Sequence, residues 1–294
     1  MSLAGRADAP APSRARPTRH ESFLAYARFR FLKIAIAVSA AAILLYVVVK
    51  PYGARYGGSW AGWTLGITGA LMILWLTWFG YRKRAYRTSE VKLAAWLSAH
   101  VYLGLALLVV ATLHTGFDFG WDIHTLAYVL MVAVIASGVF GVFCYAIYPR
   151  RMTENRRGLD LRQMLLRIAG LDEDLRREAL ALPDAPAALV LRAVETTAVG
   201  GSLWRQLSAR YPDCATAAAL DGLGRTDPDA LAEHAAALRQ VRILLEEKAL
   251  LLARARRDIR YKAIMEAWLY IHVPLTFALL AALLAHIVAV LWLW

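Results

Sequence analysis

Five long apolar stretches constrain the fold of this chain more than any other feature of its sequence. They cover residues 31–49, 60–80, 93–115, 125–148 and 263–294. A helix needs roughly 20 residues to cross a hydrocarbon core of about 30 Å, so each stretch is long enough to span a membrane. The composition agrees, because 59% of the residues are hydrophobic and the mean hydropathy is +0.45. We therefore expect an all-α fold, a bundle of five transmembrane helices, rather than a water-soluble domain.

Basic residues lie almost entirely on one side of these predicted spans. Of the 34 Lys and Arg residues, 32 fall on the side of the N-terminus, and only Lys50 and Arg55 lie opposite. Because Lys and Arg near span ends are retained in the cytoplasm, the N-terminus is predicted to be cytoplasmic and the C-terminus periplasmic, in a bacterial inner membrane. Topology and attraction to anionic membrane lipid account for the net charge of +12, so no nucleic acid partner is expected.

The chain divides into four predicted parts. These are a cytoplasmic N-terminal tail (1–30), transmembrane helices one to four (31–148), a cytoplasmic insertion (149–262) and transmembrane helix five (263–294). Apolar residues at three- and four-residue spacing make the insertion helical. We expect its helices over 171–182, 185–198 and 202–211.

A further long helix is expected to lead from the insertion toward the fifth span. Thr226 or Asp227 is its predicted N-cap, with Pro228 in the first turn. The insertion carries no glycine-rich phosphate loop, paired carboxylates or nucleophile motif. We interpret it as a small helical module that packs against itself or against a partner.

Four of the seven histidines form two matched pairs within predicted spans. His100 and His114 lie in the third span, His272 and His286 lie in the fifth, and each pair is separated by 14 residues. At about 100° and 1.5 Å per residue, this spacing returns a side chain to within about 40° of the same face, roughly 21 Å further along the helix. Each helix therefore offers two imidazoles near opposite faces of the bilayer.

Equal depth predicts how these histidines pair across the bundle. The third and fifth spans run in the same direction by the topology above, so His100 is expected to face His272 and His114 to face His286. Neutral imidazole is an axial ligand of haem iron, and two b-type haems would use all four residues. The alternative is that the histidines are polar residues hydrogen-bonded inside the bundle. Four residues at matched spacing and depth favour ligation, because polar groups are costly in lipid.

Small residues on the same faces are candidates for contact with a porphyrin. Gly104 shares the face of His100 and His114, and Gly138 lies in the fourth span near Ser137 and Gly141. Ordinary close packing of helices explains such glycines equally well.

The histidine-bearing segments resemble the ferric reductase-like transmembrane domain. The resemblance is carried by WLSAHVYLGLALLVVATLHTGF, IASGVFGVFCYAIYPR and YIHVPLTFALLAALLAHIVAV. In that superfamily of NADPH oxidases, ferric reductases and similar dihaem cytochromes b, the third and fifth helices each supply two histidines to two stacked haems. The matching positions here are His100, His114, His272 and His286.

The sequence also departs from this family. The family's flavin- and nicotinamide-binding domain would follow a sixth helix, whereas this sequence ends at Trp294 and no GxGxxG motif follows a strand-like run. We therefore expect transmembrane electron transfer through two haems b, as the membrane subunit of an oxidoreductase or a quinone-linked conduit. Electrons would be exchanged with a partner subunit, a soluble carrier or a quinone.

Two other functions fit the same residues. One is a non-redox signalling or scaffold protein whose cytoplasmic module acts, and the other is a metal or proton transporter with a histidine relay. His124, at the outer start of the fourth span beside Asp122, is interpreted as a quinone proton-transfer residue, a haem-propionate partner or a surface histidine.

Overall fold

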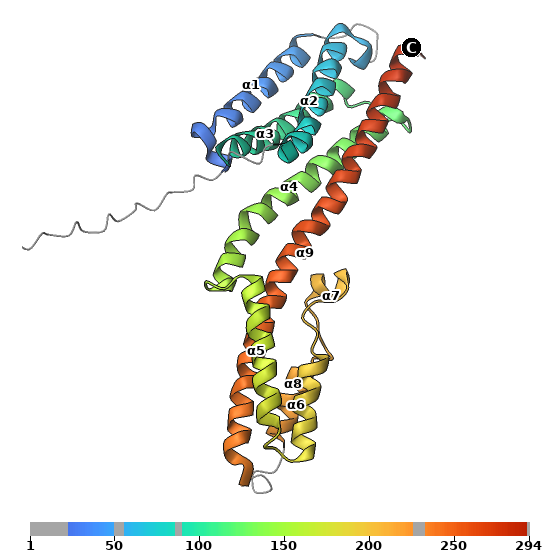
Figure 1. Cartoon of the computed structure of the whole chain (residues 1–294). Coiled ribbons are helices and arrows are strands. Elements are labelled where there is room, and N and C mark those ends of the chain that lie inside the picture. The colour runs from blue at the N-terminus through green and yellow to red at the C-terminus, as the bar shows by residue number, and fades with distance from the viewer. Residues whose placement is uncertain (1–22, 50–55, 86–89, 226–232, 293–294) are drawn as a thin grey trace, which may run out of the picture. The chain divides into compact units, whose positions relative to one another are not determined.

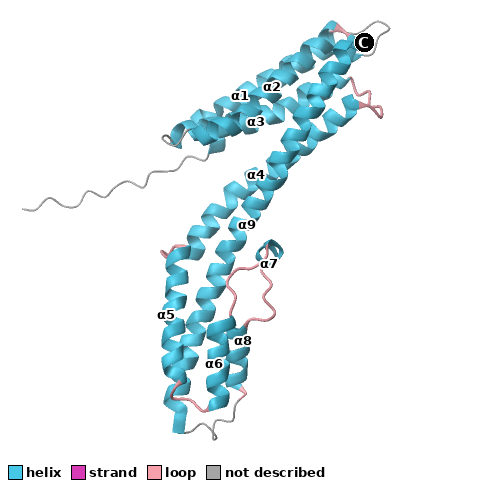
Figure 2. Cartoon of the chain, turned by 45° about the vertical axis from the view of Figure 1, so that its right-hand side comes forward, coloured by secondary structure: helices cyan, strands magenta, loops and turns pink. Residues whose placement is uncertain are grey.

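The protein is an all-α integral membrane protein in its computed structural model, which describes residues 23–49, 56–85, 90–225 and 233–292 (Figure 1). Within these ranges there is no β-strand (Figure 2), and five helices are long and apolar enough to cross a membrane. The chain forms two compact units, Met1–Phe119 and Gly120–Trp294. Three of the five helices belong to the first unit and two to the second.

The first unit is built around its third helix. The membrane helices are α1 (Tyr26–Val48), α2 (Trp60–Ala85) and α3 (Glu90–Thr115). Helix α3 packs against both α1 and α2, which scarcely touch each other. Its Val110 and Leu113 bury against Ala42 of α1 and Leu65 of α2. These apolar contacts hold α3, which carries two of the four histidines, between two neighbours.

The second unit is organised by two long helices that lie side by side. Helix α4 (Ile123–Arg156) and helix α9 (Ala235–Trp292) form its most extensive contact (Figure 1). Glycine permits their close approach, because a Cβ on Gly141 would lie 2.2 Å from the indole ring of Trp268. That indole also donates from Nε1 to the Ser137 carbonyl at 2.6 Å.

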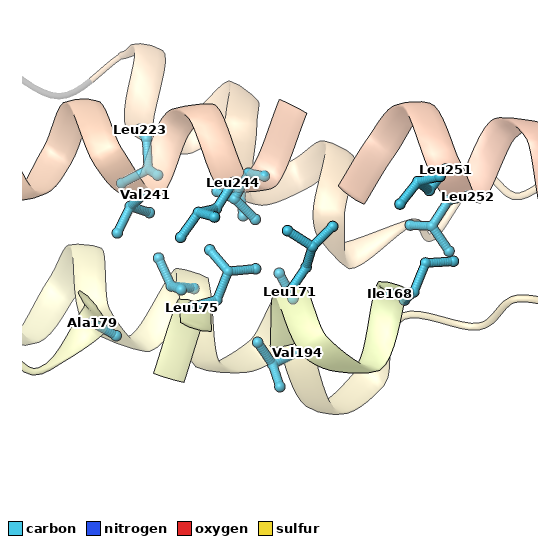
Figure 3. Close-up of a cluster of buried hydrophobic side chains, with 14 of the residues drawn as sticks. Ile168, Leu171, Leu175, Ala179, Val194, Leu223, Val241, Leu244, Leu251 and Leu252 are labelled. Carbon is cyan, nitrogen blue, oxygen red and sulfur yellow. The ribbon is translucent and has the colours of Figure 1, made fainter. Parts of the chain in front are cut away.

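The predicted cytoplasmic insertion forms a helical module on the first half of α9. It comprises α5 (Leu161–Ala179), α6 (Asp184–Thr196), α7 (Leu203–Ser208) and α8 (Ala215–Gly224). Figure 3 shows leucines of α5 facing those of α9, with Val194 of α6 and Leu223 of α8 beside them. The module thus has its own hydrophobic core. Because α9 runs unbroken through Pro274, it also connects this core directly to the membrane.

The helix boundaries differ from expectation mainly in the module. Helix α5 begins at Leu161 rather than near residue 171, because Asp160 and Gln163 form a reciprocal capping box. Helix α8 was not predicted, and α7 is shorter than expected. The predicted N-cap at Thr226 or Asp227 and the proline at 228 lie outside the described residues.

Candidate cofactor-binding histidines

The imidazole of His114 is positioned by the backbone of the neighbouring helix. Its Nδ1 lies 2.8 Å from the carbonyl oxygen of Gly62 in α2. A Cβ on Gly66, one turn further along α2, would lie 2.6 Å from Cε1 of the same ring. The ring therefore occupies space that only glycine leaves open at position 66.

This contact decides which nitrogen of His114 carries the proton. A carbonyl oxygen only accepts hydrogen bonds, so Nδ1 must be the donor. In a neutral imidazole the lone pair is then on Nε2. Donation from the other ring nitrogen to a carbonyl is the arrangement that orients metal-ligating histidines.

His272 in α9 has an equivalent arrangement, with a hydroxyl in place of the carbonyl. Its Nδ1 lies 2.7 Å from Oγ of Ser137 in α4, and that hydroxyl also lies 2.7 Å from the Val134 carbonyl. Because the hydroxyl must donate its one proton to the carbonyl, it accepts from Nδ1 of His272. The Nε2 atom of His272 again carries the lone pair.

His286 contacts a second histidine. Its Nδ1 lies 2.5 Å from Nδ1 of His124 in α4. The two rings meet edge to face, with centroids 4.6 Å apart. His124 is therefore neither an isolated surface side chain nor remote from the predicted ligands.

The remaining predicted residues lie on the expected helices. His100 is half-buried in α3, four residues before Gly104. A Cβ on Gly104 would meet nothing within 4 Å, whereas one on Gly138 would lie 3.5 Å from Cε1 of His272. Gly104 thus borders open space, and Gly138 packs against a predicted ligand.

Each histidine pair is described within its own unit. His100 and His114 lie on α3 of the first unit, and His272 and His286 lie on α9 of the second. The pairing of His100 with His272, and of His114 with His286, stays a prediction.

Several supporting residues were not identified from the sequence. Gly62 and Gly66 hold His114, and Trp268 lies beside His272 with ring centroids 5.3 Å apart. Four-residue spacing between Gly62 and Gly66 was the available signal, since it places both on one face of a helix. Nothing in the sequence indicated that Ser137 would bond His272.

Comparison with known proteins identifies no relative. No protein-family model matches the chain, and no curated protein or solved structure matches it. Within the described part of the chain, no group of three or more His, Cys, Asp or Glu side chains is placed to hold a metal ion. A haem iron held by two imidazoles needs no such group.

Proposed function

We propose that this protein is a dihaem cytochrome b that transfers electrons across a membrane. The observation that carries the proposal is the shared orientation of His114 and His272. Each lies in a membrane helix and gives its Nδ1 proton to a neighbouring helix, so Nε2 carries the lone pair and is the atom that would ligate iron. Each has a partner 14 residues away on its own helix.

The residues around these histidines support this proposal. Gly62, Gly66 and Ser137 orient the two imidazoles, while Gly104 leaves open space one turn from His100. We assign the inner haem site, nearer the cytoplasm, to His100 and His272. We assign the outer haem site, nearer the periplasm, to His114 and His286. Haem b supplies one-electron chemistry when bound, and the apolar helices provide the low-dielectric surroundings.

The resemblance to ferric reductase-like membrane domains supports the same proposal. We propose that the chain works with a redox partner subunit, a soluble electron carrier or a quinone. The charge asymmetry supports a bacterial inner membrane with the N-terminus in the cytoplasm.

A proton or metal relay is the second candidate, and the contact between His124 and His286 favours it. Two imidazoles joined through their Nδ1 atoms can pass a proton between them by exchanging donor and acceptor roles. This function requires neither His100 nor His272.

The visible spectrum of the purified protein separates these functions. We expect dithionite reduction to produce sharp b-type bands equivalent to two haems per chain. A folded, colourless protein would refute the dihaem proposal. His114→Ala and His286→Ala should each remove the same outer haem, while His100→Ala and His272→Ala should each remove the other. His234→Ala in the module is the control and should leave both haems.

A further inference from the structure

Helix α7 is attached to the part of α9 that approaches the membrane. The guanidinium of Arg256 in α9 donates to the Ala198 carbonyl, and it stacks over the Tyr211 ring at 3.9 Å from the centroid. Ala198 and Tyr211 flank α7 on either side in the chain, and α7 itself packs on α9. The position of α7 along α9 is therefore set from both of its ends.

The predicted membrane span of α9 begins close to this attachment. The apolar stretch of α9 starts at Ala263, seven residues after Arg256 and roughly 10 Å further along the helix. Tyr148 of α4 and Tyr261 of α9 pack together just before it, with ring centroids 5.2 Å apart. Tyrosine and tryptophan are enriched at the level of the lipid headgroups.

The pictures show the level of α7 along α9. Figures 1 and 2, taken from different directions, both show α7 beside α9 at the level where α4 ends and α5 begins. Helices α6 and α8 lie further from the membrane-spanning part of α9. Helix α7 thus lies at the end of the module that is nearer to the spans of its own unit, as the start of α5 does.

Large apolar side chains of α7 point away from the protein. Trp204 is 79% exposed and Leu203 is 50% exposed, although the module has a hydrophobic core of its own. Nearby basic residues are Arg205, half-buried in α7, and the exposed Arg210. An apolar surface with tryptophan and arginine is the composition of segments that lie in the interface of a membrane.

We propose that α7 docks in the headgroup layer of the membrane that this chain spans, with Trp204 and Leu203 in contact with lipid. Proximity to the predicted span of α9 supports lipid as the occupant, because the attachment of α7 at Arg256 lies roughly 10 Å along the helix from Ala263, where the apolar stretch starts. The exposed Arg210 complements anionic headgroups, whereas Arg205 pairs with Asp213 at 3.9 Å. The contact gives the module a second attachment to the bilayer besides α9 and does not depend on the proposed haems.

Lipid quenching of tryptophan fluorescence tests this docking on the full-length protein. The protein is placed in nanodiscs of plain lipid or of lipid brominated near the headgroup end of the acyl chains. The contribution of Trp204 is the difference in fluorescence emission between the wild type and Trp204→Phe. We expect brominated lipid to remove most of this contribution, and aqueous iodide to leave it largely intact.

A transplanted tryptophan provides the matched control. Leu180, at the end of α5, is 88% exposed and lies about 20 residues of helix from the α4–α5 turn. In the double variant Trp204→Phe with Leu180→Trp, the new emission should be quenched by iodide and unaffected by brominated lipid. If the Trp204 contribution behaves like that of the control, lipid docking is wrong. A surface that awaits a protein partner would give this contradicting result, because no partner is present in the nanodisc.

Discussion

The Nδ1 atoms of His124 and His286 lie 2.5 Å apart across the α4–α9 contact. One of the two nitrogens must donate and the other accept, so each ring constrains the tautomer of the other. In the proposed outer site, His286 would be a ligand, and His124 would position it without touching the iron. His124 is thereby distinguished from the four predicted ligands.

Replacement of His124 should consequently tune the outer haem without removing it. We expect His124→Ala to retain two haems and to shift the midpoint potential of one, because the orientation and basicity of His286 change. Potentiometric titration measures the shift, with His286→Ala as the comparison that loses the haem. Loss of a haem in His124→Ala would make His124 a ligand and contradict this assignment.

Gly66 should be required for the position of His114. An alanine Cβ there would lie 2.6 Å from Cε1 of the imidazole, so Gly66→Ala must displace the ring from the Gly62 carbonyl. We expect reduced occupancy or an altered low-spin signal of one haem, measured by haem content and electron paramagnetic resonance. Gly69→Ala is the control on the same helix, since its nearest contacts are ordinary ones of 3.8 and 3.9 Å. Equal spectra for wild type and Gly66→Ala would show that the ring does not sit there.

Gly141 should be required for the pairing of α4 with α9. Gly141→Ala places a Cβ against the Trp268 ring, and overpacking of this kind costs about 1–3 kcal/mol. Thermal unfolding in detergent should show the loss. Gly170→Ala, on an exposed face of α5 with open space around it, should instead stabilise the helix by roughly 0.5–1 kcal/mol.

Loss of Arg156 and loss of Asp258, which form an ion pair, should lower the stability of the protein by unequal amounts. Its bonds are 2.9 and 2.8 Å long, and the exposed fraction is 2% for the carboxylate side chain but 36% for the arginine. Arg156→Ala leaves a buried carboxylate without its partner, so we expect it to cost about 3 kcal/mol. Asp258→Ala should cost less, because the remaining guanidinium reaches water. The denaturation midpoints of the two variants measure both losses of stability. Arg150→Ala, which removes an exposed pair with Glu154, should change stability by under about 0.5 kcal/mol.

The thiol of Cys214 should ionise below its ordinary range. Its partial burial by itself raises the pKa, but hydrogen bonds from the Ala217 backbone N–H and from Arg256 outweigh burial, and the net pKa is lowered. The thiolate therefore persists to a lower pH than in a free cysteine. Iodoacetamide alkylation against pH should have a lowered midpoint that moves upward in Arg256→Gln. An unchanged midpoint would show that the guanidinium does not act on the sulfur.

The periodic features of this protein follow from its sequence alone. Runs of apolar residues predicted the five membrane helices, and spacing placed His100 with His114 and His272 with His286. These features are local, because the rise and twist of a helix depend only on residues adjacent in the chain. The start of α5 was equally local, and the Asp160–Gln163 capping box was a signal in the sequence that our prediction did not use.

Tertiary structure decided which groups surround each histidine. These contacts depend on the rotation and height of one helix against another. They are the hydrogen bond from His114 to the Gly62 carbonyl, the hydrogen bond from His272 to the Ser137 hydroxyl, and the contact between His124 and His286. Helix packing is set by the sum of many side-chain contacts, such as Gly141 against Trp268, which no single segment encodes. The exposure of Trp204 has the same origin, since apolar spacing locates a helix but only the assembled module determines which of its faces is left uncovered.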